Sequence, residues 1–342
     1  RQERFWPRFA RFLADLAGRE GADLIHGQHL LSIPAAVGAG QTLGLPTVAT
    51  VRDYWPTCPI GTRLQRCPET AHCAPACQVC CLSRDRAPLR PLVRAALPYV
   101  SANLRRRQRA LLAADRTVAV STYVADVLRA GVPGLEPVVI PNFIDLRAVQ
   151  PRAEGETRGG APDPRPFVLY AGKLEPHKGA DLLPAALAAV PGARLVIAGD
   201  GPLAGQVARE CAALGVVVEL RGERPNDEVL ALMRAADALI FPARWEGPLT
   251  RTLLEAGSVG LPAVALATGG TPDIIRDGER GLLAAEPAGL GPALATLLAD
   301  PARRARMSAA ARAHIAANFA EAVVVPRVEA LYRALVAAKR AR

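Results

Sequence analysis

The chain has 342 residues, half of them hydrophobic and 22% charged, a balance that supports folded cores and excludes a disordered protein. Its length favours two domains, and no apolar run reaches the roughly 18–20 residues that span a bilayer. The formal net charge is +10, but aromatic residues make up only 4% and do not interleave with a basic stripe, which argues against a single-strand nucleic-acid binder.

The first 146 residues alternate between helical and strand patterns. Residues 4–18 have the spacing of an amphipathic helix, and Gly18 is a suitable end for it. Short buried strands are expected at DLIHG, LPTVATV, TVAV and PVVI, and helices at SIPAAVGAGQTLG, 101–113 and 122–130. A cysteine-rich stretch, residues 58–81, interrupts this alternation as an irregular loop. The pattern predicts a parallel sheet.

The alternation stops and then restarts. Residues 147–166 are rich in Pro, Gly and charge and lack apolar periodicity, which indicates an interdomain linker. The strands expected after it are FVLYAG, ARLVIAG, VVVEL, ALIFP and PAVAL, with helices at 179–190, 203–214, 226–236 and 251–259. We therefore predict two doubly wound α/β domains, 1–146 and 167–315, followed by a C-terminal helix in 316–342.

Polar and glycine-rich loops follow the strands of the second domain, at the ends where such sheets bind ligands. AGKLEPHKG holds two of the chain's three lysines, Lys173 and Lys178, and a lysine suits a phosphate group. GGTPDII offers backbone N–H groups at a helix start, which also suits phosphate. The plainer alternatives are solvated lysines and a simple turn with a Thr cap.

Taken in order, nine segments resemble one family. They are DLIHGQHLLS, TVRDYWPTC, VAVSTYVADVL, VIPNFID, AGKLEPHKG, IAGDGP, AADALIFPARWEGP, LLEAGSVGLPAVA and TGGTPDIIRDGERGLL. The ordered set resembles the retaining, nucleotide-sugar-dependent glycosyltransferases of family 4 (glycosyltransferase group 1) over nearly the whole chain. The resemblance implies the GT-B fold, in which two Rossmann-like domains face each other across a cleft and the C-terminal helix crosses back. It also implies an acceptor domain first and a donor domain second.

The resemblance assigns roles residue by residue. Lys173 and Lys178 match the cations that grip the donor diphosphate, Glu255 matches the glutamate that binds the ribose, and Glu246 matches the glutamate near the sugar hydroxyls. The remaining donor-site positions are Gly172, Asp200, Gly269, Gly270 and Thr271, while Arg52 and Asp53 contact donor or acceptor. In this family the leaving phosphate deprotonates the acceptor, so neither a carboxylate nucleophile nor a catalytic metal is expected.

Three features depart from the family pattern. Glu246 and Glu255 are separated by eight residues instead of seven, so either a local bulge keeps Glu246 in place or Gly247 takes its position. Arg52 stands where many relatives have His. The family's first strand and its glycine-rich loop are not found, and we expect the chain to be N-terminally incomplete.

Six of the seven cysteines lie in CPIGTRLQRCPETAHCAPACQVCC. Cys77 and Cys80 form a C-x2-C pair and, with Cys58 and Cys67, predict a structural zinc site, for which Cys73 or Cys81 could substitute. An intracellular location favours metal over disulfides. Unpaired or disulfide-forming thiols and an iron–sulfur or redox role stay open as alternatives.

The expected function is transfer of a hexosyl group from a UDP- or GDP-sugar to a glycan, a lipid carrier or a small-molecule hydroxyl, as in polysaccharide biosynthesis. A cytoplasmic location is expected, and the arginine-rich helix 101–113 suits docking on the anionic inner face of the plasma membrane. A different nucleotide-sugar enzyme such as an epimerase, an inactive relative that only binds nucleotide-sugars, and a zinc-dependent nucleic-acid protein are the competing hypotheses. Among these, a nucleic-acid partner is the least expected.

Overall fold

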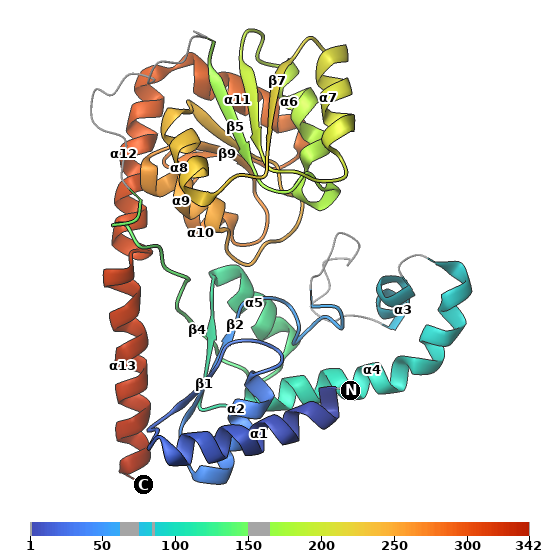
Figure 1. The fold of residues 1–342 in the computed structure, drawn as a ribbon, viewed down its shortest axis with the longest axis vertical. Coiled ribbons are helices and arrows are strands. Elements are labelled where there is room, and N and C mark those ends of the chain that lie inside the picture. The colour runs from blue at the N-terminus through green and yellow to red at the C-terminus, as the bar shows by residue number, and fades with distance from the viewer. Residues whose placement is uncertain (1, 62–74, 84–85, 150–164, 342) are drawn as a thin grey trace. The chain divides into compact units, whose positions relative to one another are not determined.

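The computed structural model describes residues 2–61, 75–83, 86–149 and 165–341, shown in Figure 1. These residues form two compact units, of which the first is Arg1–Asn142 with Val325–Arg342 and the second is Phe143–Val324. Most of the predicted linker lies outside the described residues. Each unit is built on a parallel sheet with helices packed against it, as the sequence predicts.

Unit 1 contains a four-stranded parallel sheet in the order β1-β2-β3-β4. Its strands are β1 (Ile25–Gly27), β2 (Thr47–Val51), β3 (Arg116–Ala119) and β4 (Val138–Val139). Its helices are α1 (Gln2–Arg19), α2 (Ile33–Leu43), α3 (Pro75–Ser83), α4 (Arg90–Leu112) and α5 (Thr122–Gly131), with a 3-10 turn η1 (Ala87–Leu89). Every residue of β2 is buried, as expected for an inner strand of a parallel sheet.

Unit 2 contains a six-stranded parallel sheet in the order β10-β9-β8-β5-β6-β7. Its strands are β5 (Phe167–Ala171), β6 (Arg194–Ala198), β7 (Val217–Gly222), β8 (Ala238–Phe241), β9 (Ala263–Leu266) and β10 (Gly281–Ala284). Its helices are α6 (Leu183–Ala188), α7 (Ala204–Ala213), α8 (Asn226–Ala235), α9 (Arg251–Val259), α10 (Thr271–Ile274), α11 (Leu290–Ala299) and α12 (Pro301–Asn318), with 3-10 turns η2 (Pro176–Lys178), η3 (Ala180–Leu182) and η4 (Pro287–Gly289).

The strands of unit 2 bury apolar side chains on both faces. Leu169 and Leu239 pack with α8, α9 and α12, whereas their strand neighbours Val168 and Ile240 pack with α6, α7 and α11. Figure 1 shows helices on both sides of this sheet. The alternation follows from the two-residue side-chain period of a strand. Because helices cover both faces, the sheet is doubly wound.

The order of strands reverses beside β5. The chain runs from β5 outward to β6 and β7, returns to β8 on the opposite side of β5, and continues outward to β9 and β10. The helices that follow β5 and β8, α6 and α9, therefore pack on opposite faces of the sheet. Such a reversal is the position at which open α/β sheets bind their ligands.

The last helix, α13 (Glu321–Arg340), contributes its residues from Val325 onward to unit 1. Arg327 donates a 2.7 Å hydrogen bond to the carbonyl of Val139, and Arg340 pairs with Asp23 at 2.7 Å. The Tyr332 hydroxyl is hydrogen-bonded to the His26 ring on β1. The C-terminal helix thus returns to the first unit, as the family resemblance implies.

Two elements differ from the sequence-based expectation. The helix expected at 101–113 begins earlier, at Arg90, and includes Pro98 in its interior. The end of the cysteine-rich stretch is the helix α3 instead of irregular loop, and it starts at Pro75, a residue suited to a first helical turn. Among the described helices, none combines the length and the apolar character needed to cross a membrane.

The buried His26 ring, which contacts Tyr332 of α13, makes the stability of the fold depend on pH. Its Nε2 atom lies 2.7 Å from the Thr50 hydroxyl, and burial, together with the charge of Arg52, lowers the pKa of His26 to about 4. The unfolded chain therefore binds more protons than the folded chain between pH 6.5 and 4, so acidification over this range destabilises the fold. We expect His26 to account for a loss of about 2 kcal/mol, allowing for its partial exposure.

Urea unfolding of wild type and His26→Gln across this pH range measures the effect. The wild-type free energy of unfolding should fall more steeply with acid than that of the variant. His29→Gln, a change at an exposed histidine, is the control that keeps the steep dependence. Equal slopes for wild type and His26→Gln would contradict the assignment.

Candidate functional site

Three loops meet at the carboxyl ends of the central strands of unit 2. They follow β5, β8 and β9, and they contain the lysines, the first glutamate and the glycine pair that the sequence singled out. The carboxyl ends of neighbouring parallel strands share one edge of the sheet. The sheet order therefore brings residues 172–179, 242–250 and 267–271 together.

The loop after β5 carries both lysines. Lys173 is exposed, and the buried Tyr170 donates a 2.7 Å hydrogen bond to its carbonyl, which fixes the start of the loop. Lys178 ends the 3-10 turn η2, and its Nζ lies 4.7 Å from the centroid of the Trp245 ring. Burial lowers the pKa of Lys178, the nearby Glu175 opposes that shift, and Lys173 adds to it. A desolvated ammonium held on an aromatic face is suited to pair with a phosphate oxygen.

The backbone locks the loops after β5 and β8 together. Gly179 has a φ of +71°, and a Cβ at this position would overlap the carbonyl oxygen of Pro242. The Trp245 amide donates to the His177 carbonyl at 3.0 Å. Arg244 pairs with Asp181 at 2.6 Å. The lysine loop is thus held against the tryptophan loop at several points.

The loop after β9 packs against the same tryptophan loop. Gly269 has a φ of +53°, and a Cβ there would overlap the Gly247 carbonyl oxygen. The Gly270 amide donates to that same oxygen at 2.8 Å, and Thr268 donates its hydroxyl to the Ala243 carbonyl at 2.8 Å. Thr271 is buried and begins α10. Gly269 and Gly270 therefore lie beside Glu246 and Gly247.

The two glutamates differ in their surroundings. Glu255, on α9, is 5% exposed and accepts a 2.8 Å bond from the largely exposed Arg251 through its Oε1 atom. Glu246 is half-buried, and the Gly247 amide donates to the Trp245 carbonyl at 2.7 Å. This bond closes a three-residue turn centred on Glu246. Which position fills the first-glutamate role stays a prediction.

Asp200 and Gly172 belong to the neighbouring strand ends. Asp200 follows β6, is exposed, and its carboxylate accepts from the Gly201 amide at 2.7 Å. Its carbonyl accepts from the Leu174 amide at 2.9 Å, and the Gly172 amide donates to the Ala198 carbonyl at 3.0 Å. These bonds tie the loop after β6 to the lysine loop.

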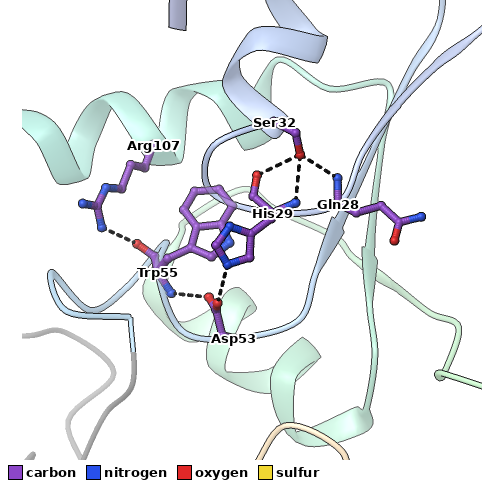
Figure 2. Close-up of polar contacts among 6 residues, drawn as sticks. All are labelled: Gln28, His29, Ser32, Asp53, Trp55 and Arg107. Carbon is purple, nitrogen blue, oxygen red and sulfur yellow. Dashed lines mark hydrogen bonds and ion pairs between the residues drawn. The ribbon is translucent and has the colours of Figure 1, made fainter. Parts of the chain in front are cut away.

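A second polar cluster lies at the carboxyl ends of β1 and β2 in unit 1 (Figure 2). His29 follows β1, Asp53 follows β2, and the His29 Nε2 lies 3.5 Å from the Asp53 Oδ2. Beside them, Arg52 donates to the Gln28 side-chain oxygen at 2.7 Å. Arg52 and Asp53 are therefore brought together with two residues that the sequence analysis did not select. The signal that could have found them is two polar residues directly after a predicted strand.

Burial raises the pKa of Asp53, while the Trp55 amide, His29 and Arg107 oppose that shift. The Trp55 amide donates to the Asp53 Oδ1 at 3.0 Å, and Arg107 donates to the Trp55 carbonyl at 3.1 Å. Figure 2 shows these contacts around the buried tryptophan. The Asp53 carboxylate is thus held by the Trp55 backbone, which Arg107 in turn holds in place.

The cysteines of the predicted zinc set are only partly described. Cys58 is buried, Cys77 and Cys80 are half-buried on α3, and the Cys77 and Cys81 sulfurs lie 3.9 Å apart. Cys67 lies outside the described residues. Among the residues that are described, no three His, Cys, Asp or Glu side chains gather so as to hold a metal ion. The zinc site is therefore not supported here and stays a prediction.

Two protein-family profiles match the chain. The family described as "Glycosyltransferase Family 4" matches residues 1–148, and the family described as "Glycosyl transferases group 1" matches residues 152–314. The two matched ranges correspond closely to the two alternating blocks of the sequence.

Individual relatives match over shorter ranges. The chain is 32% identical over 254 residues to D-inositol 3-phosphate glycosyltransferase 1 of Catenulispora acidiphila. The aligned region covers 68% of this chain and 60% of the relative. It is 34% identical over 217 residues to the glycogen synthase of Mycobacterium tuberculosis, covering 61% of this chain and 50% of the relative. The chain thus spans about half to three-fifths of these relatives.

Solved structures share the fold at low sequence identity. Sucrose-phosphate synthase from Thermosynechococcus elongatus superposes with a TM-score of 0.73 at 23% identity, covering 97% of this chain and 78% of that one. Anabaena Alr3699/HepE in complex with UDP and glucose superposes with a TM-score of 0.69 at 20% identity, covering 95% of this chain and 81% of that one. These similarities establish the GT-B fold.

The close approach at Gly179 can be tested directly. Gly179→Ala would force a Cβ into the Pro242 carbonyl, whereas Gly215 has a similar φ of +68° and open space, with no atom within 4 Å of where its Cβ would lie. Gly215→Ala should cost about 1 kcal/mol of stability from backbone strain alone. Gly179→Ala should cost at least about 2 kcal/mol more. Urea unfolding compares the two, and equal losses would show that the loops are not locked at this point.

Proposed function

This chain belongs to the family 4 and group 1 glycosyltransferases, and on that premise we propose that it transfers a hexosyl group from a nucleoside-diphosphate sugar to a hydroxyl acceptor with retention of configuration. The observation that carries the proposal is the pair of lysines at the strand-order reversal of unit 2. Lys173 is exposed there, and Lys178 is partly desolvated on Trp245. Compact positive charge at this position suits a diphosphate.

Each loop of the donor site would have its own task. Lys173 and Lys178 neutralise the diphosphate as it departs, and the backbone around Gly269 and Gly270 adds N–H groups toward phosphate and sugar. Glu255 binds the ribose diol through the carboxylate oxygen that Arg251 does not use. Glu246 approaches the hydroxyls of the transferred sugar. These roles follow the family resemblance, and the proximity of the loops supports them.

Charge stabilisation and positioning would account for the rate. In the retaining reaction that the family resemblance implies, the acceptor oxygen forms its bond to the anomeric carbon on the face from which the phosphate leaves. The acceptor proton passes to that departing phosphate, so no protein carboxylate acts as a nucleophile. The protein would contribute fixed cations, oriented amides and bound geometry.

A uridine or guanosine diphosphate is the expected leaving group. One structural neighbour was solved with UDP-glucose, and one relative is named as a GDP-mannose-dependent mannosyltransferase. These names describe those proteins. For this chain they define the donors to be tried first.

Nucleotide binding tests the donor site. UDP or GDP should raise the melting temperature of wild type, because a ligand that binds only the folded state stabilises it. Lys178→Ala should weaken that binding by at least about tenfold and lower turnover of the matching sugar donor by orders of magnitude. Lys339→Ala, a change at the third lysine of the chain, is the matched control.

The outcomes separate the hypotheses. Near-wild-type binding and turnover by Lys178→Ala would refute the assignment of Lys178. Nucleotide binding without turnover of any sugar donor would indicate the inactive relative. A wild type that neither UDP nor GDP stabilises would refute the donor site.

Trp245 provides an independent test of how Lys178 is placed. Trp245→Leu removes the aromatic face, so Lys178 should become more mobile and more hydrated, and UDP binding should weaken several-fold. Trp245→Phe keeps an aromatic face and should retain most of the affinity. Calorimetric titration with UDP compares the two variants, and equal affinities would show that the stacking has no role.

A further inference from the structure

Arg251 holds the buried Glu255 with only part of its guanidinium group. Its Nε donates to the Glu255 Oε1 at 2.8 Å. Among the described residues, neither terminal nitrogen of Arg251 donates a hydrogen bond to the protein. The Arg251 side chain is 80% exposed, so the outer edge of the guanidinium faces solvent. Most of its N–H donors are therefore available to a ligand.

The stability of α9 does not account for this arginine. Arg251 is the first residue of α9, where the positive end of the helix dipole disfavours a cation. It also precedes its acidic partner by four residues, which is the less favourable order for an ion pair on a helix. An ion pair with so exposed an arginine adds little to stability. A role in ligand binding would explain what helix stability does not.

Glu255 keeps one carboxylate oxygen for a ligand. Its Oε1 is bonded to Arg251, and across the part of the chain that the structure describes no donor is bonded to its Oε2. A buried charge is unfavourable unless further hydrogen bonds complete its shell, and a ribose diol would supply them. The bond from Arg251 also fixes the orientation in which the carboxylate meets that diol.

The start of α9 lies where the loops after β8 and β9 meet. Thr250 directly precedes Arg251, and the Thr250 hydroxyl would lie 3.4 Å from a Cβ placed on Gly247. The Gly247 carbonyl in turn accepts from the Gly270 amide at 2.8 Å. Arg251 thus begins its helix one residue away from the contact between the two loops.

The covalent structure of a nucleotide links ribose to phosphate. The α-phosphate of a nucleoside diphosphate is joined to the ribose ring through a single carbon. A ribose bound at Glu255 would therefore carry its α-phosphate close to the arginine that holds the same carboxylate. A guanidinium fork matches two oxygens of a phosphate, and its charge complements that of the phosphate.

We propose that Arg251 binds the α-phosphate of the donor nucleotide through its terminal nitrogens while its Nε holds Glu255, so that one side chain joins recognition of the ribose to recognition of the phosphate. The inference rests on the proposed function, because it takes a nucleoside-diphosphate sugar to bind unit 2. It gives Arg251 a different task from Lys173 and Lys178. The α-phosphate keeps its charge during transfer, whereas negative charge develops on the β-phosphate that leaves, so Arg251 contributes to donor binding and not to the chemical step.

A ligand series tests the contact with phosphate. Calorimetric titration compares UDP, UMP and uridine, with competition against UDP for the weaker ligands, or GDP, GMP and guanosine if the wild type prefers guanine. Arg251→Gln should weaken UDP and UMP at least about tenfold and uridine by no more than about twofold. Arg251→Lys keeps the positive charge and should recover part of the loss. Arg333→Gln removes an exposed arginine that pairs with Glu329 at the same spacing and the same 2.8 Å, and it should leave all three affinities unchanged.

The Glu255→Gln background separates a phosphate contact from the effect of an unpaired carboxylate. In that background no buried charge is left without a partner when Arg251 is changed, so the comparison also holds if Arg251→Gln alone fails to fold. Adding Arg251→Gln to Glu255→Gln should still weaken UDP and UMP several-fold more than uridine. A phosphate-specific loss that disappears in this background would overturn the proposal, because repulsion by Glu255 would then account for it.

Donor kinetics separate Arg251 from the lysines. With the matching sugar donor, Arg251→Gln should raise KM at least about tenfold while kcat stays within about threefold. A fall in kcat as large as that of Lys178→Ala would overturn the assignment, because Arg251 would then act on the departing phosphate.

The remaining outcomes are equally decisive. Equal weakening of UDP, UMP and uridine by Arg251→Gln would show that Arg251 acts only through Glu255. Weakening of UDP without weakening of UMP would move the contact to the β-phosphate. Either result overturns the proposal and leaves the proposed function intact, whereas a wild type that binds neither UDP nor GDP refutes the proposed function itself.

Discussion

The parallel pairing of β5 with β8 is the constraint on which the candidate site of unit 2 depends. Because β5 also pairs with β6 on its other edge, the chain leaves β5 and β8 toward opposite sides of the sheet. The helices after β5 and β8 pack on opposite faces of the sheet, and the loops that lead into them carry polar groups at the carboxyl ends. Both lysines follow β5, Trp245 and Glu246 follow β8, and the glycine pair follows the adjoining β9.

Close backbone contact is what turns these three loops into one site. Gly179 and Gly269 each occupy positions where a side chain would collide with a neighbouring carbonyl, so each loop approaches the next more closely than other residues permit. A loop held in this way keeps its amides oriented before any ligand arrives. Such preorganisation is the main means by which a protein stabilises developing charge. Lys178, stacked on Trp245, is held by the same arrangement.

Unit 1 presents a different set of polar groups from unit 2. Its strand ends carry an imidazole, a carboxylate, an amide and a guanidinium in two contacting pairs. The lysines and loop amides of unit 2 present positive charge, whereas the groups of unit 1 mix hydrogen-bond donors with acceptors. The same position in two related folds thus carries different chemistry.

Strand and helix periodicity and the ordered loop motifs are local in the chain, so most of the elements and the family could be predicted from the amino-acid sequence. It singled out Lys178, Glu255 and the glycine pair as candidate site residues, and it raised the question of the extra residue after Glu246. Which of these loops touch became known only from the folded chain. Trp245 meets Lys178, and His29 meets Asp53, because of the order in which strands pair, and that order depends on contacts between segments far apart in the chain. Periodicity carries no information about such contacts, so the partners of His29 and Lys178 could not be read from the sequence.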